Sequence, residues 1–252
     1  MPIRTAVFLI TVSGLVFEIG LTRIYSATIW YHFAFVAISV ALLGWGLGGL
    51  AVHLAKGRFA PSHTAAGLCT LLYGLAIPVC LAILVAFPFE LDRLPLYFVT
   101  PLVPFFLAGI ALSMVFDLHR DLAGSLYFAD LLGASFGAVL VTVLLQLLGG
   151  EATVLAAAVA PMVAAACLSP RLRGVATVGG VLLALGAGAS ATTDFFHVTP
   201  GTIKAMRRQM DEITGSKIAQ TGWNAYSRID AVEGLPAPFL ARLFIDSDAW
   251  TT

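Results

Sequence analysis

Long apolar stretches separated by short polar breaks fill the first three quarters of the sequence. They predict membrane-spanning helices, because about 20 apolar residues cross the hydrocarbon core and a helix satisfies its own backbone polar groups there. The breaks leave seven candidate spans, at residues 5–22, 29–54, 65–88, 97–116, 125–148, 152–168 and 174–192. The predicted fold is therefore an all-α polytopic membrane bundle over residues 1–193, followed by a short C-terminal α+β tail.

The tail has the pattern of a small polar domain. Apolar residues first recur at helical spacing: Ile203, Met206, Met210 and Ile213. They predict an amphipathic helix inside a linker at 194–222, either lying on the membrane or packing on a domain. Two strand-like runs, 226–232 and 241–246, then predict a β-hairpin within 223–252. Because a lone hairpin is marginally stable in water, we expect it to begin a larger domain that these residues leave incomplete.

Composition supports a membrane protein. Hydrophobic residues make up 59% and charged residues 11% of the 252 residues, against about 45–50% and about 25% in soluble domains. The net charge is zero, so the bilayer is the expected partner and nucleic acid is not. The cysteines lie in apolar runs without metal-ligand spacing and are interpreted as small buried hydrophobes: Cys69, Cys80 and Cys167. We predict neither a metal site nor a cofactor in this chain.

The loops between the seven spans differ in positive charge. One side holds six basic residues, Arg4, Lys56, Arg58, Arg120, Arg171 and Arg173, and the other holds Arg23 and Arg93. Positive residues favour the cytoplasmic side. We therefore expect the N-terminus in the cytoplasm of a bacterial inner membrane, with the tail on the opposite side if the span count is odd.

Three ionisable residues lie within or beside predicted spans, where charge is costly and often functional. They are Glu18, Arg23 and Asp130. One interpretation is a proton or substrate site, and the other is an ion pair that fixes two helices. Arg23 and Asp130 could pair if they lay on one side of the membrane, but with seven spans they would not.

Small residues recur at four-residue spacing on two predicted helices. Gly44 and Gly48 form one stripe, and Ala129, Gly133 and Gly137 form the other. Such stripes let helix backbones approach closely in lipid. We predict packing inside the bundle here, with a dimer interface as the alternative.

Several segments together resemble one family, the bacterial membrane-bound spermidine-synthase-like proteins. The membrane matches are Ser13-Gly14, residues 18–23, residues 44–49 and residues 127–134 with Gly137. The tail matches are residues 226–229 and 243–246. The resemblance implies that Tyr226 and Asp246 belong to the two strands leading into an aminopropyltransferase-type catalytic fold. It also implies a decarboxylated S-adenosylmethionine-type cosubstrate, but only for a form that possesses the nucleoside-binding domain.

The sequence departs from the family where catalysis would occur. Ser227 and Trp250 stand where the family places glutamine, and Ser247 replaces a glycine. A Gly-rich nucleotide loop after the strands is missing. The leading hypothesis is therefore the catalytically incomplete membrane module of a spermidine-synthase-like protein. The alternatives are a small transporter or channel-like protein with a polar regulatory tail, and a bundle with a structural role.

Overall fold

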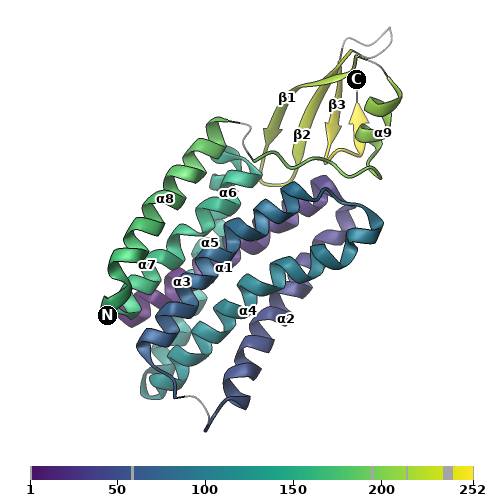
Figure 1. Cartoon of the computed structure of the whole chain (residues 1–252). Coiled ribbons are helices and arrows are strands. Elements are labelled where there is room, and N and C mark those ends of the chain that lie inside the picture. Colours follow the sequence, from purple (N-terminus) through teal and green to yellow (C-terminus); the bar gives the residue numbers. More distant parts are fainter. Residues whose placement is uncertain (1, 58–59, 194–195, 214, 235–240, 252) are drawn as a thin grey trace.

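The computed structural model describes residues 2–57, 60–193, 196–213, 215–234 and 241–251. Its membrane part consists of α1 (Pro2–Thr28), α2 (Ala34–Leu54), α3 (His63–Ala86), α4 (Leu94–Leu118), α5 (Ala123–Leu148), α6 (Gly150–Ala157), α7 (Val159–Leu168) and α8 (Arg173–Thr192). Within the described ranges, seven helical spans are long and apolar enough to cross a membrane, with α6 and α7 together forming the sixth. This confirms the predicted multi-pass bundle (Figure 1).

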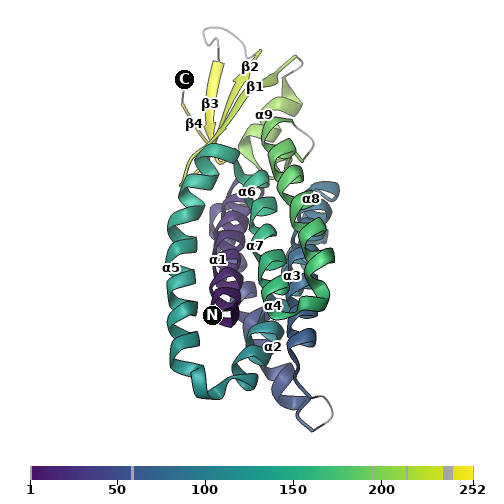
Figure 2. The same cartoon turned by 90° about the vertical axis from the view of Figure 1, so that its left-hand side faces the viewer.

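α1 is the central helix of the bundle and packs against α2, α4, α5, α6 and α7 (Figure 2). It is longer than the predicted span 5–22 and continues past Glu18 and Arg23 to Thr28. The sequence pattern ended the helix too early because polar residues were counted as breaks. Neighbouring helices shield most of α1 from lipid, so its polar side chains need not face hydrocarbon.

The sixth span is broken at Ala158, between α6 and α7. Ser13 of α1 donates a hydrogen bond to the Ala157 carbonyl at 2.7 Å, and its hydroxyl lies 2.8 Å from the Tyr73 hydroxyl of α3. A carbonyl freed by a helix break must find another donor inside a membrane. Ser13 supplies it, so the break is built into the packing of three helices.

Both small-residue stripes lie at helix–helix contacts within the chain. A Cβ added at Gly48 would lie 2.5 Å from the Phe106 carbonyl of α4, and one added at Gly133 would lie 2.5 Å from the Phe8 carbonyl of α1. These distances leave no room for a side chain. The stripes therefore set how closely α2 approaches α4 and how closely α5 approaches α1.

The tail forms a four-stranded antiparallel sheet at the end of the bundle where α1 and α8 finish (Figures 1 and 2). Its strands, in the order β1-β2-β3-β4, are β1 (Lys217–Trp223), β2 (Arg228–Glu233), β3 (Ala241–Ile245) and β4 (Ala249–Thr251). The predicted hairpin is β2–β3, paired through Ile229 with Ile245 and Ala231 with Leu243. The sequence pattern missed β1, which it placed in the linker, and the three-residue β4, because neither shows apolar alternation.

The expectation that the hairpin lacks a partner was wrong. β1 and β4 flank it, and α9 (Ala205–Glu212) covers one face, where Met206 packs with Val232 and Phe244 in a small core. The amphipathic helix therefore packs on a domain, one of its two predicted placements. The sheet contacts the bundle through polar groups near the end of β3, where Asp246 accepts a hydrogen bond from Ser26 of α1.

Candidate functional site at the bundle–sheet junction

Two residues of the tail, Tyr226 and Asp246, are hydrogen-bonded to the last two turns of α1. Arg23 Nη1 donates a hydrogen bond to the Tyr226 carbonyl at 2.8 Å, and Ser26 Oγ donates one to Asp246 Oδ2 at 2.7 Å. The Tyr226 side chain itself is exposed. The structure therefore brings Arg23, Tyr226 and Asp246 to one junction, although the sequence placed Arg23 in an intramembrane group.

Asp246 connects three segments at this junction. Its Oδ1 accepts a hydrogen bond from the Arg228 amide at 2.9 Å, while its own amide donates to the Arg228 carbonyl at 2.8 Å. Asp246 and Ser247 have φ values of 48° and 60°, a left-handed conformation that is uncommon outside glycine. Both residues adopt this conformation although neither is glycine.

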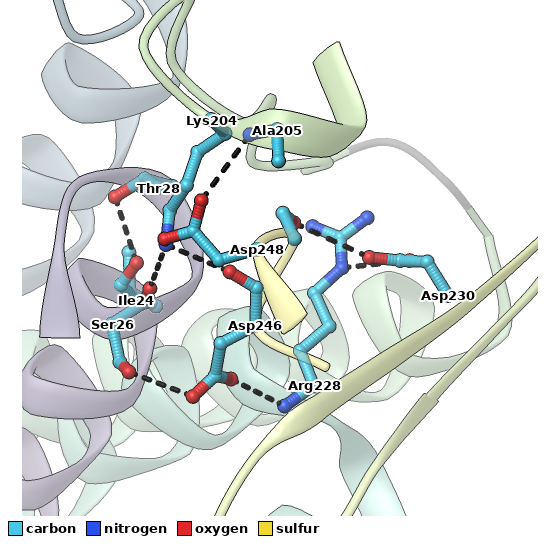
Figure 3. A network of polar contacts seen from close by, with 10 residues as sticks. Ile24, Ser26, Thr28, Lys204, Ala205, Arg228, Asp230, Asp246 and Asp248 are labelled. Carbon is cyan, nitrogen blue, oxygen red and sulfur yellow. Dashed lines mark hydrogen bonds and ion pairs between the residues drawn. The ribbon is translucent and has the colours of Figure 1, made fainter. Parts of the chain in front are cut away.

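Lys204 is the cation that ties the linker to both α1 and the sheet (Figure 3). Its Nζ donates to the Ser26 carbonyl at 2.7 Å, the Asp246 carbonyl at 2.7 Å and Asp248 Oδ2 at 2.9 Å, and its side chain is fully buried. All three ammonium protons therefore have acceptors. Burial lowers the pKa of Lys204 below its ordinary value, although the hydrogen bond to Asp248 opposes that shift.

A second buried cation, Arg228, fixes β2 to the linker. Its Nε donates to Asp230 Oδ1 at 2.9 Å and its Nη1 to the Val198 carbonyl at 2.8 Å, and neither Arg228 nor Asp230 is exposed. Asp230 also accepts a hydrogen bond from Thr221 of β1 at 2.7 Å. A buried ion pair costs desolvation that only good geometry and further hydrogen bonds offset. This pair has both.

A polar groove of about 350 Å³ opens beside this network, between the ends of α5 and α8 and strand β1. Polar side chains from five segments line it: Gln146, Glu151, Ser190, Thr193, His197 and Thr221. Trp223 forms one wall and lies so close to the turn between α5 and α6 that a Cβ at Gly150 would be 2.8 Å from its ring. No sequence pattern indicates this groove, because the residues that line it are far apart along the chain.

The other predicted polar residues lie within the bundle, away from the junction. Asp130 Oδ1 lies 3.1 Å from Thr11 Oγ1. α1 and α5 run in the same direction, so Arg23 is about 18 Å further along α1 than Thr11, at 1.5 Å per residue. Arg23 and Asp130 therefore do not pair, as the seven-span topology requires. Asp130 instead meets the hydroxyl of Thr11, a partner that the sequence had not suggested.

Glu18 lies half-buried in α1 without a hydrogen bond or ion pair to any described residue. Within the same described ranges, no group of three His, Cys, Asp or Glu side chains is placed to hold a metal ion. The junction is thus a network of buried ion pairs and hydrogen bonds beside an open polar groove. Its geometry suits holding a domain and binding a small polar group.

Lys204, Arg228 and Asp248 were not predicted as site residues. Lys204 directly precedes α9, and its side chain is buried in the junction. No protein-family model matches the sequence, and no curated protein or solved structure matches it significantly.

Proposed function

We propose that this chain is the membrane module of a spermidine-synthase-like protein, a bundle that presents a short antiparallel sheet as the platform for a nucleoside-binding domain. The observation that carries the proposal is the attachment of Tyr226 and Asp246 to Arg23 and Ser26 of α1. The residues that resemble the start of the catalytic fold are also those that the bundle holds in place.

The outer face of the sheet supports the same proposal. Ile229, Leu243 and Ile245 project from it and are 36%, 43% and 44% exposed. Apolar side chains clustered on one face of a sheet commonly mark a surface that another element covers. The nucleoside-binding domain is the occupant that we propose, and a decarboxylated S-adenosylmethionine-type cosubstrate would belong to that domain.

The proposal is tested with protein purified from its native membrane by an antibody against the tail. We expect the purified material to bind a labelled adenosyl nucleoside, whereas residues 1–252 expressed alone do not. Leu243→Asp should abolish the binding in the native material, while Arg208→Asp on the exposed side of α9 should retain it. Binding that survives Leu243→Asp, or that is absent from the native material, would refute the platform role.

The orientation of the module is a separate proposal. Arg4, Lys56, Arg120, Arg171 and Arg173 lie at the end of the bundle opposite the sheet, which favours a cytoplasmic N-terminus in a bacterial inner membrane. The resemblance favours a cytoplasmic sheet instead, because an adenosyl cosubstrate is made there. Reporter fusions at Thr252 and in the loop at Arg120 decide between them. An external Thr252 would separate the sheet from that cosubstrate and would count against an enzymatic use.

Glu18 favours a second candidate function, that of a small transporter or channel-like protein with a regulatory tail. A carboxylate without a protein partner in a membrane span is by default a candidate for ion or proton binding. Proton flux into proteoliposomes that Glu18→Gln abolishes and Glu90→Gln leaves unchanged would support transport. Equal flux with and without the protein would exclude it.

A further inference from the structure

We infer that the polar groove lined by Gln146, Glu151, Ser190 and Trp223 binds the primary ammonium headgroup of a membrane lipid. This inference does not depend on the proposed function. The volume of the groove, about 350 Å³, falls within the range of small-ligand sites. Its position and its charge identify the ligand.

The charge comes from Glu151. This residue is 8% exposed, and its Oε1 accepts a hydrogen bond from the Val198 amide at 3.1 Å. No described Lys, Arg or His lies within ion-pair distance of its carboxylate. A carboxylate offers about four acceptor positions, and the Val198 amide occupies one of them. Glu151 also lies in the first turn of α6, where the helix dipole favours a negative charge, but no side-chain cation of the described residues neutralises it.

Other groups in the groove are suited to hydrogen bonding with an ammonium. Ser190 Oγ is buried and has no hydrogen-bond partner in the described part of the chain. Gln146 lines the same groove with an amide oxygen. An ammonium has three donors and no acceptor, which matches one carboxylate and two neutral oxygen acceptors.

The described residues that line the groove include no Lys or Arg. Arg228 lies behind the wall of the groove, with its guanidinium 5.9 Å from the centre of the Trp223 ring. It is fully buried and already bonded to Asp230 and Val198. An anionic headgroup would therefore meet the Glu151 carboxylate with no Lys or Arg in the described lining to offset it, whereas a cationic headgroup would be attracted.

The position of the groove favours a lipid as the source of the ammonium. It lies where α5 and α8 end, at Leu148 and Thr192. Leu147 and Leu185 on these two helices are 74% and 65% exposed, which gives acyl chains an apolar surface to follow. Tryptophan is also enriched at the membrane–water interface, where Trp223 would lie.

The test measures the thermal unfolding midpoint of the whole chain in detergent during titration with lipids of identical acyl chains. Phosphatidylethanolamine should raise the midpoint in a saturable way, while phosphatidylglycerol and phosphatidylcholine should raise it less. Glu151→Gln keeps the acceptor for the Val198 amide and removes only the charge. It should weaken the apparent affinity for phosphatidylethanolamine about tenfold, equivalent to about 1.4 kcal/mol.

Two controls keep the result interpretable. Glu90→Gln removes an exposed carboxylate that pairs with Arg93 at the same end of the bundle, and it should leave the lipid effect unchanged. Gln146→Leu should weaken the effect without altering any charge, and it replaces Glu151→Gln if that variant fails to fold. Equal effects of all three lipids, or equal losses in Glu90→Gln and Glu151→Gln, would overturn the inference. A saturable shift with free ethanolamine equal to that with the lipid would overturn the lipid as its source.

Discussion

Arg23 of the central helix donates a hydrogen bond to the main-chain carbonyl of Tyr226, 203 residues later in the sequence. The acceptor is a main-chain carbonyl, so the contact depends on the position of the backbone between β1 and β2 and not on the side chain of residue 226. Ser26, one turn further along α1, makes the corresponding contact with the Asp246 side chain. The two contacts hold successive parts of the sheet against one helix, which makes the end of α1 the attachment point of the tail.

The buried pair Arg228–Asp230 should be the costliest part of the junction to disrupt. Arg228→Ala leaves Asp230 buried without its cation, and losing one partner of such a pair costs about 3–5 kcal/mol. Chemical unfolding of the tail, followed by the fluorescence of Trp223 in variants that lack the other three tryptophans, measures the loss.

Arg207→Ala provides the matched control for that experiment. Arg207 pairs with Asp211 on the exposed side of α9, and such surface pairs contribute about 0–1 kcal/mol. If both variants lose the same small amount, Arg228 does not stabilise the junction and the sheet is attached by other contacts.

Sequence reasoning recovered the elements whose apolar periodicity is strong. The seven spans and the β2–β3 hairpin follow from runs of residues such as 226–232. It could not recover Lys204 and Arg228 as buried residues, because a charged residue is buried only when distant partners such as Asp248 and Asp230 are in place. These pairings depend on how the tail folds back on α1, which no local pattern contains. The groove containing Glu151 was missed for the same reason.

Gly133→Leu should destabilise the bundle far more than Gly188→Leu. A side chain at Gly133 would meet the Phe8 backbone of α1, whereas a Cβ at Gly188 has open space around it. Overpacking costs about 1–3 kcal/mol even where side chains can adjust, and a backbone cannot. Thermal stability of the two variants in the same detergent is the measurement, and equal midpoints would show that α5 does not rely on this contact with α1.

The lowered pKa of Lys204 predicts a pH dependence of stability. Its folded-state pKa lies below the ordinary 10.5, so between these two values the unfolded chain binds a proton that the folded chain has released. Stability then rises with pH across this window. The free energy of unfolding of the wild type should therefore increase relative to that of Lys204→Met as pH approaches 10.5. A wild-type curve that falls relative to the variant would mean that Asp248 outweighs burial and raises the pKa.

Charge reversal at Arg23 and Asp130 should give additive effects. The two residues lie at different depths of the bundle, and substitutions more than about 7–10 Å apart usually add within about 0.3–0.5 kcal/mol. Unfolding free energies of Arg23→Glu, Asp130→Lys and the double variant provide the measurement. Recovery of stability in the double variant would place the two charges in contact and would contradict the seven-span arrangement.

The contacting pair, Thr11 and Asp130, should behave differently. The Thr11 hydroxyl has one proton and two neighbouring acceptors, the Val7 carbonyl at 2.6 Å and Asp130 Oδ1 at 3.1 Å. Removing the hydroxyl with Thr11→Val and the charge with Asp130→Asn should therefore show a coupling of about 0.5–3 kcal/mol, as contacting residues do. Coupling here and additivity at Arg23 would identify the α1–α5 contact as the structural role of Asp130. Additivity in both cycles, with Asp130→Asn stable but inactive in proton flux, would instead mark Asp130 as a functional acid and strengthen the transport candidate.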